Sequence, residues 1–133
     1  MLKPDFTKYS LALVDENKIT FFSEGHGLKP LWACLEKYRQ VKGKFILFDK
    51  VMGLAAAKLV SYSGIISAVK TLLISQSAKK YLKENHIKIE AKTTVANILI
   101  KDRRSICPGE IITLNTDEPD DFRVKIKKML SNF

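Results

Sequence analysis

The sequence has little cysteine and no long apolar run, and each shortage excludes a class of protein. No apolar stretch approaches the roughly 18 residues that a membrane-spanning helix needs. Pro4 and Asp5 interrupt the N-terminus, where a secretion signal would continue from a charged start into an apolar run. The two cysteines, Cys34 and Cys107, lie far apart, which is weak support for a disulfide. We therefore expect a cytoplasmic protein with two free thiols and no membrane span.

Arginine is also scarce, although the chain is basic. The formal net charge is +9, and it comes from 19 Lys and only 4 Arg. Contacts to base edges and bidentate contacts to phosphates favour the planar guanidinium group. The lysines occur in nearly every segment instead of one block, as on a generally solvated surface. Any nucleic-acid binding should therefore be weak, independent of sequence and sensitive to salt.

Length and composition favour one folded unit. The chain has 133 residues, of which 46% are hydrophobic and 28% are charged, with only four prolines and six glycines. These values are close to the averages for globular proteins, and a chain of this length can bury one sizeable core. No internal repeat or linker-like segment interrupts it. We expect a single domain over residues 1–133.

Hydrophobic periodicity predicts a hairpin followed by alternating helices and strands. Apolar and β-branched residues at 9–14 and 19–22 flank a polar turn and predict two strands, and the spacing at 28–38 predicts a helix. The later elements expected are a strand at 45–48, a helix at 49–60 closed by Gly64, a strand at 65–73, a helix at 75–85, a strand at 87–94 and a terminal helix at 120–130. This order is typical of an α/β protein with parallel crossovers.

Four short motifs give the chain a family resemblance. They are Gly27-Leu28-Lys29-Pro30-Leu31, Asp49-Lys50-Val51-Met52-Gly53-Leu54-Ala55-Ala56-Ala57, Ser77-Ala78-Lys79-Lys80-Tyr81-Leu82 and Cys107-Pro108-Gly109-Glu110. With these motifs and this order of elements, the chain resembles a small prokaryotic family of uncharacterised proteins with a cytidine-deaminase-like fold. The resemblance implies a three-layer α-β-α sandwich with a mixed sheet.

The zinc-binding motifs of working deaminases are missing. Those enzymes carry His-x-Glu at one helix start and Pro-Cys-x-x-Cys at the next, because three ligands must hold zinc while the Glu moves protons. Here His26 is followed two residues later by Leu28, and the segment from Asp49 to Gly53 has no cysteine. We expect no bound metal and no other cofactor, and so no zinc-dependent deamination. A ligand pocket at the same helix starts is still compatible with these changes.

Asp49, Lys50 and Gly53 are the first candidates for a ligand site. They follow a buried strand where a helix is expected to begin, at the sheet edge where α/β proteins bind ligands. The helix start and Lys50 would hold an anion, and Asp49 a ribose hydroxyl or a base amine, which suggests a nucleotide-type small ligand. In the alternative interpretation Asp49 is only an N-cap and Gly53 allows close packing. That alternative accounts for the small residues but not for Lys50.

The segment Cys107-Pro108-Gly109-Glu110 permits two interpretations. It is either a Pro-Gly turn without function, or a short helix capped by Cys107. In the second case Arg103, Arg104 and the helix start would favour the thiolate of Cys107. Cys107 would then be a catalytic nucleophile, with Glu110 among the ligand-binding residues.

Cys34 has a different setting from Cys107. It lies on the apolar side of a predicted helix, beside Trp32 and Leu35. A thiol in such a setting is usually a buried, inert part of the core.

Three functions fit the sequence, and whether the protein is an enzyme stays open. The first is a zinc-independent deaminase-like domain that binds a nucleotide-type ligand at Asp49, Lys50 and Gly53, with Cys107 as a covalent participant. The second is a thiol-dependent enzyme in which Cys107 is the nucleophile. The third is a basic module that binds proteins or nucleic acid and has no small-molecule site. Only this last function requires a contiguous lysine face.

Overall fold

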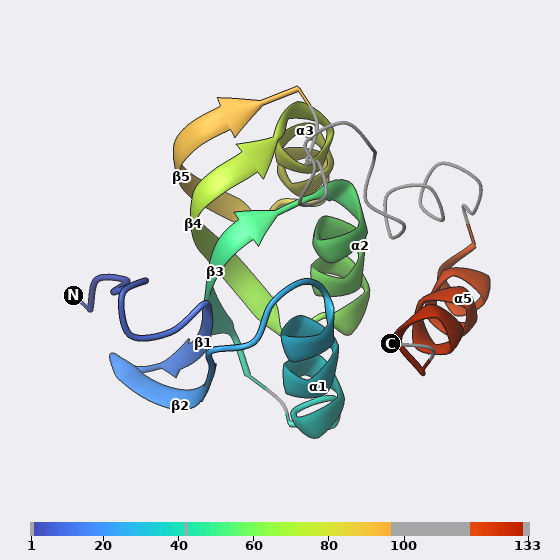
Figure 1. Ribbon diagram of the computed structural model, residues 1–133, viewed down its shortest axis with the longest axis horizontal. Coiled ribbons are helices and arrows are strands. Elements are labelled where there is room, and N and C mark those ends of the chain that lie inside the picture. Colours follow the sequence, from blue (N-terminus) through green and yellow to red (C-terminus); the bar gives the residue numbers. More distant parts are fainter. Residues whose placement is uncertain (1, 42, 97–117, 132–133) are drawn as a thin grey trace.

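One mixed sheet organises the chain (Figure 1). The computed structural model describes residues 2–41, 43–96 and 118–131. The strands are β1 (Leu11–Asp15), β2 (Lys18–Ser23), β3 (Phe45–Met52), β4 (Ile66–Ser75) and β5 (Lys88–Val95). The helices are α1 (Lys29–Lys37), α2 (Leu54–Ser63), α3 (Gln76–Glu84) and α5 (Pro119–Ser131). The sheet order is β2-β1-β3-β4-β5. Strand β1 is antiparallel to β2 and β3, whereas β3, β4 and β5 are parallel.

The predicted hairpin is confirmed. Between β1 and β2 the chain turns through Glu16 and Asn17, whose φ angles are 48° and 67°. Two successive positive φ values match the right-handed twist of a tight hairpin, and Asn tolerates them well. The turn therefore fixes the antiparallel pairing that places β1 inside the sheet and β2 at its edge.

Strand β3 extends further than the sequence pattern predicts. The expected helix at 49–60 begins only at Leu54, because Asp49 pairs with Thr71 of β4 and Met52 pairs with Ile74. These ladder bonds to a long neighbouring strand outweigh the local helical preference of the segment. Gly53 is the N-cap of α2, with extended backbone and no side-chain cap bond. The interpretation of Asp49 as an N-cap is therefore wrong.

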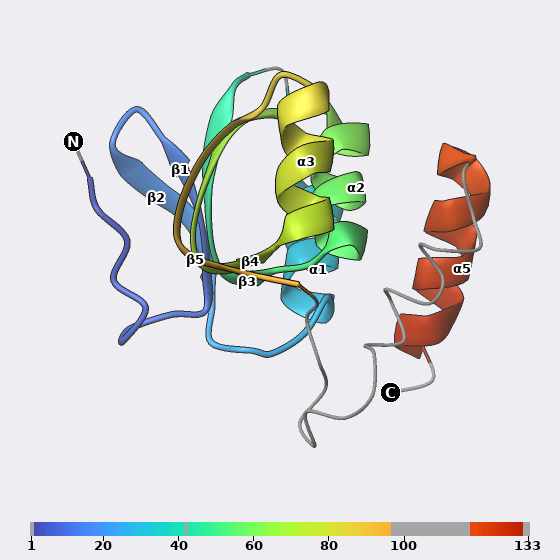
Figure 2. The ribbon, with the colours of Figure 1, turned by 90° about the horizontal axis from the view of Figure 1, so that it is seen from above.

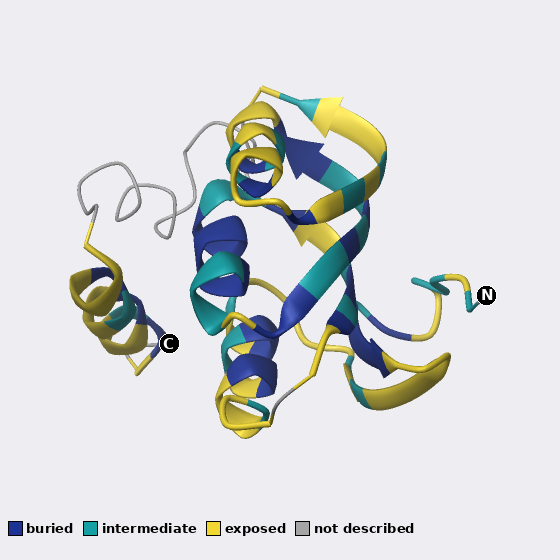
Figure 3. Ribbon diagram, turned by 180° about the vertical axis from the view of Figure 1, so that it is seen from behind, coloured by how far each residue is buried: buried dark blue, intermediate teal, exposed yellow. Residues whose placement is uncertain are grey.

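The ends of α2 and α3 follow local chemistry. Helix α2 ends at Gly64, as predicted, in the left-handed conformation with a φ of 70°. Helix α3 starts after Ser75, whose side chain accepts a hydrogen bond of 3.2 Å from the backbone N–H of Ala78. The buried alanines of α2 allow this helix to lie close to the sheet, and Figure 3 shows it buried over most of its length.

The helices described here lie on one face of the sheet (Figure 2). Helices α1, α2 and α3 form a layer on that face, and α5 packs outside α1 and α2 through Phe122 and Ile126, which are fully buried. The predicted mixed sheet is confirmed, and the helices of the described residues form layers on one face only, so a three-layer α-β-α arrangement stays a prediction. Both parallel crossovers advance in the same direction along the sheet, so right-handed connections place α2 and α3 on the same side.

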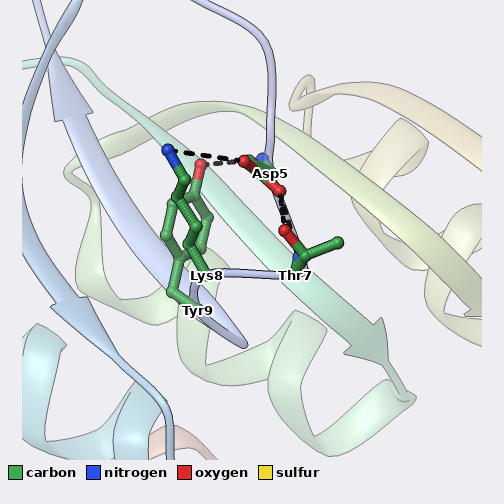
Figure 4. Close-up of polar contacts among 4 residues, drawn as sticks. All are labelled: Asp5, Thr7, Lys8 and Tyr9. Carbon is green, nitrogen blue, oxygen red and sulfur yellow. Dashed lines mark hydrogen bonds and ion pairs between the residues drawn. The ribbon is translucent and has the colours of Figure 1, made fainter.

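Residues 2–10 run along the opposite face, which we call the open face (Figure 2). Phe6 and Tyr9 of this N-terminal segment pack there against a second apolar cluster that includes Val14 and Phe48. Asp5 orders the segment: its backbone N–H donates to the Tyr9 hydroxyl at 3.0 Å, and its carboxylate accepts a hydrogen bond from the Thr7 side chain (Figure 4). The segment covers only part of the open face.

Candidate functional site

Asp49 occupies the middle of the sheet. It is a partner of Leu11 in β1 and of Thr71 in β4. Strand alternation places it on the same side as Leu47, which belongs to the core beneath the helices. It lies toward the carboxyl end of β3, four residues before Gly53, which is the N-cap of α2. Asp49 and Gly53 therefore lie toward the carboxyl end of β3, and a ligand site there stays a prediction.

The environment of Asp49 favours its neutral form. Burial raises the pKa of its carboxyl group to about 8, although backbone N–H groups of Val51 and Lys50 favour the ionised form. In the described part of the chain no Lys, Arg or His forms an ion pair with Asp49. The group is therefore mostly a carboxylic acid at neutral pH. In that form it both donates and accepts a hydrogen bond.

Cys34 lies close to Asp49, which sequence reasoning did not foresee. The thiol is fully buried on α1, as expected for an inert cysteine. Burial, together with a smaller contribution from the neighbouring Asp49 carboxyl, raises its pKa to about 12. The two residues are separated by 15 positions and meet because α1 packs on the face of the sheet toward which Asp49 points. No spacing motif would have revealed this pair.

Lys50 follows Asp49 within β3. Its backbone N–H donates to the Ser10 carbonyl at 2.9 Å, so it continues the strand. Its side chain is exposed, and consecutive residues of a regular strand point to opposite faces, so Lys50 is not expected to face the core as Leu47 does. The expected helix start at Asp49 and Lys50 is wrong, because pairing with β4 extends β3 to Met52. A joint role of the two residues in ligand binding stays a prediction.

Two predicted residues cannot be placed. Cys107 and Glu110 lie outside the described residues, as do Arg103 and Arg104, so the thiol site remains a prediction. Within the described ranges, no group of three or more His, Cys, Asp or Glu side chains could hold a metal ion. No helix of those ranges is long and apolar enough to cross a membrane.

Two hollows on the surface lie elsewhere. A cleft of about 330 Å³ between α1, α2 and α5 is lined by Trp32, Arg39 and Arg123, among others. Arg123 forms an ion pair with Glu36, and its guanidinium lies 5.5 Å from the Trp32 ring centroid. A second hollow of about 550 Å³ lies on the open face. Asp49 lines neither of them.

The fold and the site define a mixed α/β protein with a partly buried carboxyl group of raised pKa in its central strand. The chain belongs to the TM1506 family, described as a domain of unknown function (DUF1893), which matches residues 4–130. It is similar to the crystal structure of a DUF1893 family protein, TM1506 from Thermotoga maritima, with 26% identity and a TM-score of 0.77. That match covers 96% of this chain and 83% of the other. No curated protein matches the sequence. The resemblance to an uncharacterised family is confirmed.

Proposed function

We propose that this chain is a zinc-independent, deaminase-like domain that binds a nucleotide-type small ligand through Asp49. The order of its elements is the one on which the resemblance to the cytidine-deaminase-like fold rests: a hairpin, then helix, strand, helix, strand, helix and strand. The observation that carries the proposal is the partly buried Asp49 carboxyl group in the central strand, whose pKa is raised to about 8 by desolvation.

A partly buried carboxyl group that forms no ion pair within the described residues is costly to the fold. Groups of this kind, with strongly displaced pKa values, cluster at functional sites. In its neutral form Asp49 offers a donor and an acceptor side by side, which complements the amide or amidine edge of a nucleobase. Cys34 beside it stays a neutral thiol, because burial holds its pKa at about 12. The site thus suits the uncharged hydrogen-bonding edge of a nucleobase.

The start of α2 supports the nucleotide part of the proposal. Gly53 directs the chain from β3 into α2 in an extended conformation, without a side-chain cap. The positive end of the α2 dipole lies four residues along the chain from Asp49 and would attract a phosphate group of a ligand that reaches both. Cys107 as a covalent participant and Glu110 as a further contact are part of this proposal on sequence grounds.

Calorimetric titration with nucleoside monophosphates of each base tests the proposal. Binding should be measurable at about pH 6 and should weaken at about pH 9, because the Asp49 proton is lost as the pH passes the group's pKa. Asp49→Asn should retain binding and lose most of this pH dependence, whereas Asp49→Ala should abolish binding. Asp15→Asn, an exposed carboxyl at the end of β1, is the matched control. Unchanged binding by Asp49→Ala would refute the role of this residue.

The zinc-independent part has its own test. The purified protein should contain less than stoichiometric zinc, because the ligand motifs of zinc deaminases are absent from both helix starts. Elemental analysis after dialysis against zinc, compared with dialysis against a chelator, measures this directly. One tightly held zinc ion per chain would contradict the proposal.

A further inference from the structure

The part of the open face that residues 2–10 leave uncovered carries a row of lysines. Alternation along β5 places Lys88, Glu90 and Lys92 on one side of the strand, and all three are exposed. Lys70 of β4 is the register partner of Glu90, and their side chains lie 3.6 Å apart. The Lys70 ammonium is also 5.9 Å from the ring centroid of Phe48, which belongs to the open-face cluster. These contacts place the row on the face opposite the helices.

The N-terminal segment and the strands that carry these lysines line a hollow together. Lys3, Pro4 and Phe6 line one side of the hollow of about 550 Å³, and residues of β4 and β5 line the other. Lys70 and Lys92 contribute charge to it, and Leu72 contributes apolar surface. Lysines that are scattered in sequence therefore gather beside one hollow, where Glu90 is the only acidic lining residue in the described part of the chain.

We propose that this surface, the basic face formed by Lys3, Lys70, Lys88 and Lys92, binds single-stranded nucleic acid through its phosphates. The two exposed lysines of β5 are four residues apart, about 13 Å along the strand at the usual rise per residue. Such a row suits an elongated polyanion with successive charges better than one compact anion. Lysine ammonium groups neutralise phosphates as point charges and do not read base edges, so binding should be independent of sequence.

The apolar lining distinguishes a nucleic acid from an acidic peptide. Pro4, Phe6 and Leu72 give the hollow a surface against which one base can pack while the neighbouring phosphates contact the lysines. This proposal does not depend on Asp49, which points to the other face of the sheet. Glu90 opposes binding, since its carboxylate repels phosphates and pairs with Lys70.

The experiment measures fluorescence anisotropy of labelled oligothymidylate and oligouridylate over a range of salt concentrations. Lys88→Gln/Lys92→Gln should weaken binding at low salt. It should also reduce the slope of log affinity against log salt by about 1.4, since each lost phosphate contact to a single strand contributes about 0.7. The matched control is Lys80→Gln/Lys83→Gln, which removes the same charge from exposed positions of α3. Glu90→Gln should strengthen binding severalfold.

Four results would overturn the proposal. They are absence of oligonucleotide binding by the native protein, equal losses in the two double variants, tighter binding of duplex than of single strands, and tighter binding of polyglutamate than of the oligonucleotides. Circular dichroism checks that the variants are folded. Weaker oligonucleotide binding by Lys88→Gln/Lys92→Gln together with stronger binding by Glu90→Gln supports the proposal. Altered folding would not change the affinity in opposite directions at exposed positions of the same strand.

Discussion

Asp49 links the stability of the protein to pH. Its pKa is about 8 in the folded chain and 3.8 as a free side chain, so between these values the folded state binds more protons than the unfolded state. Stability therefore falls as pH rises through this window, and the loss is complete above the folded pKa. The ionised carboxylate has no cation beside it among the described residues to offset its burial.

Replacing this carboxyl by an amide should remove the effect. Asp49→Asn keeps the shape and stays neutral, so we expect it to be more stable than the native protein above about pH 8, on the order of a few kcal/mol. Below the unfolded pKa the two proteins should be nearly equal. Urea unfolding over a pH series measures the difference. Asp15→Asn is the control. If the free energies of unfolding of Asp49→Asn and the native protein changed in parallel with pH, the pKa of Asp49 would not be raised in the folded state.

The two thiols should differ in reactivity. Cys34 is fully buried and its pKa is raised to about 12, so the thiolate that attacks electrophiles is almost absent. We expect a thiol reagent to modify Cys107 much faster than Cys34 in the native protein, with both labelled after unfolding in urea. Peptide mapping by mass spectrometry identifies the adducts. Rapid modification of Cys34 under native conditions would contradict the placement of α1 against the sheet.

At the scale of single elements, glycine at the end of α2 stops the helix. Gly64 has a φ of 70°, and a Cβ added there would meet no atom within 4 Å. Gly64→Ala should therefore destabilise the protein by about 1 kcal/mol through backbone conformation alone. Gly43→Ala is the control, since that position has ordinary van der Waals space and no positive φ. If the two substitutions lowered the thermal unfolding temperature equally, the positive φ of Gly64 would not be the cause of the destabilisation.

At the scale of the whole molecule, α5 joins the end of the chain to the core. Phe122 is fully buried, its ring lies 5.8 Å from that of Tyr62, and the Lys58 ammonium is 5.7 Å from its centroid. Arg123 adds the ion pair to Glu36 of α1. These contacts join residues that are 60 or more positions apart. The stability of the sheet and its helices should consequently depend on α5.

Truncating Phe122 tests this dependence. Phe122→Ala should lower the free energy of unfolding by about 3–5 kcal/mol, the usual cost of removing a buried aromatic ring. Val124→Ala on the exposed side of the same helix should change it by less than about 0.5 kcal/mol. Denaturant unfolding followed by circular dichroism gives both values. A small effect of Phe122→Ala would mean that α5 is not part of the cooperative unit.

The sequence by itself determined the order of the elements, because hydrophobic periodicity, the polar turn between the first two strands and the Gly64 stop are local signals. It also identified the family, the buried state of Cys34 and the position of Asp49 toward the carboxyl end of a strand. Only the tertiary structure decided that β3 continues to Met52, since strand pairing with β4 outweighs local helical preference. It likewise placed Lys50 within a strand, brought Cys34 beside Asp49 and gathered scattered lysines on the open face. These relations depend on which strands pair and which face a helix covers, and neighbouring residues alone do not encode them.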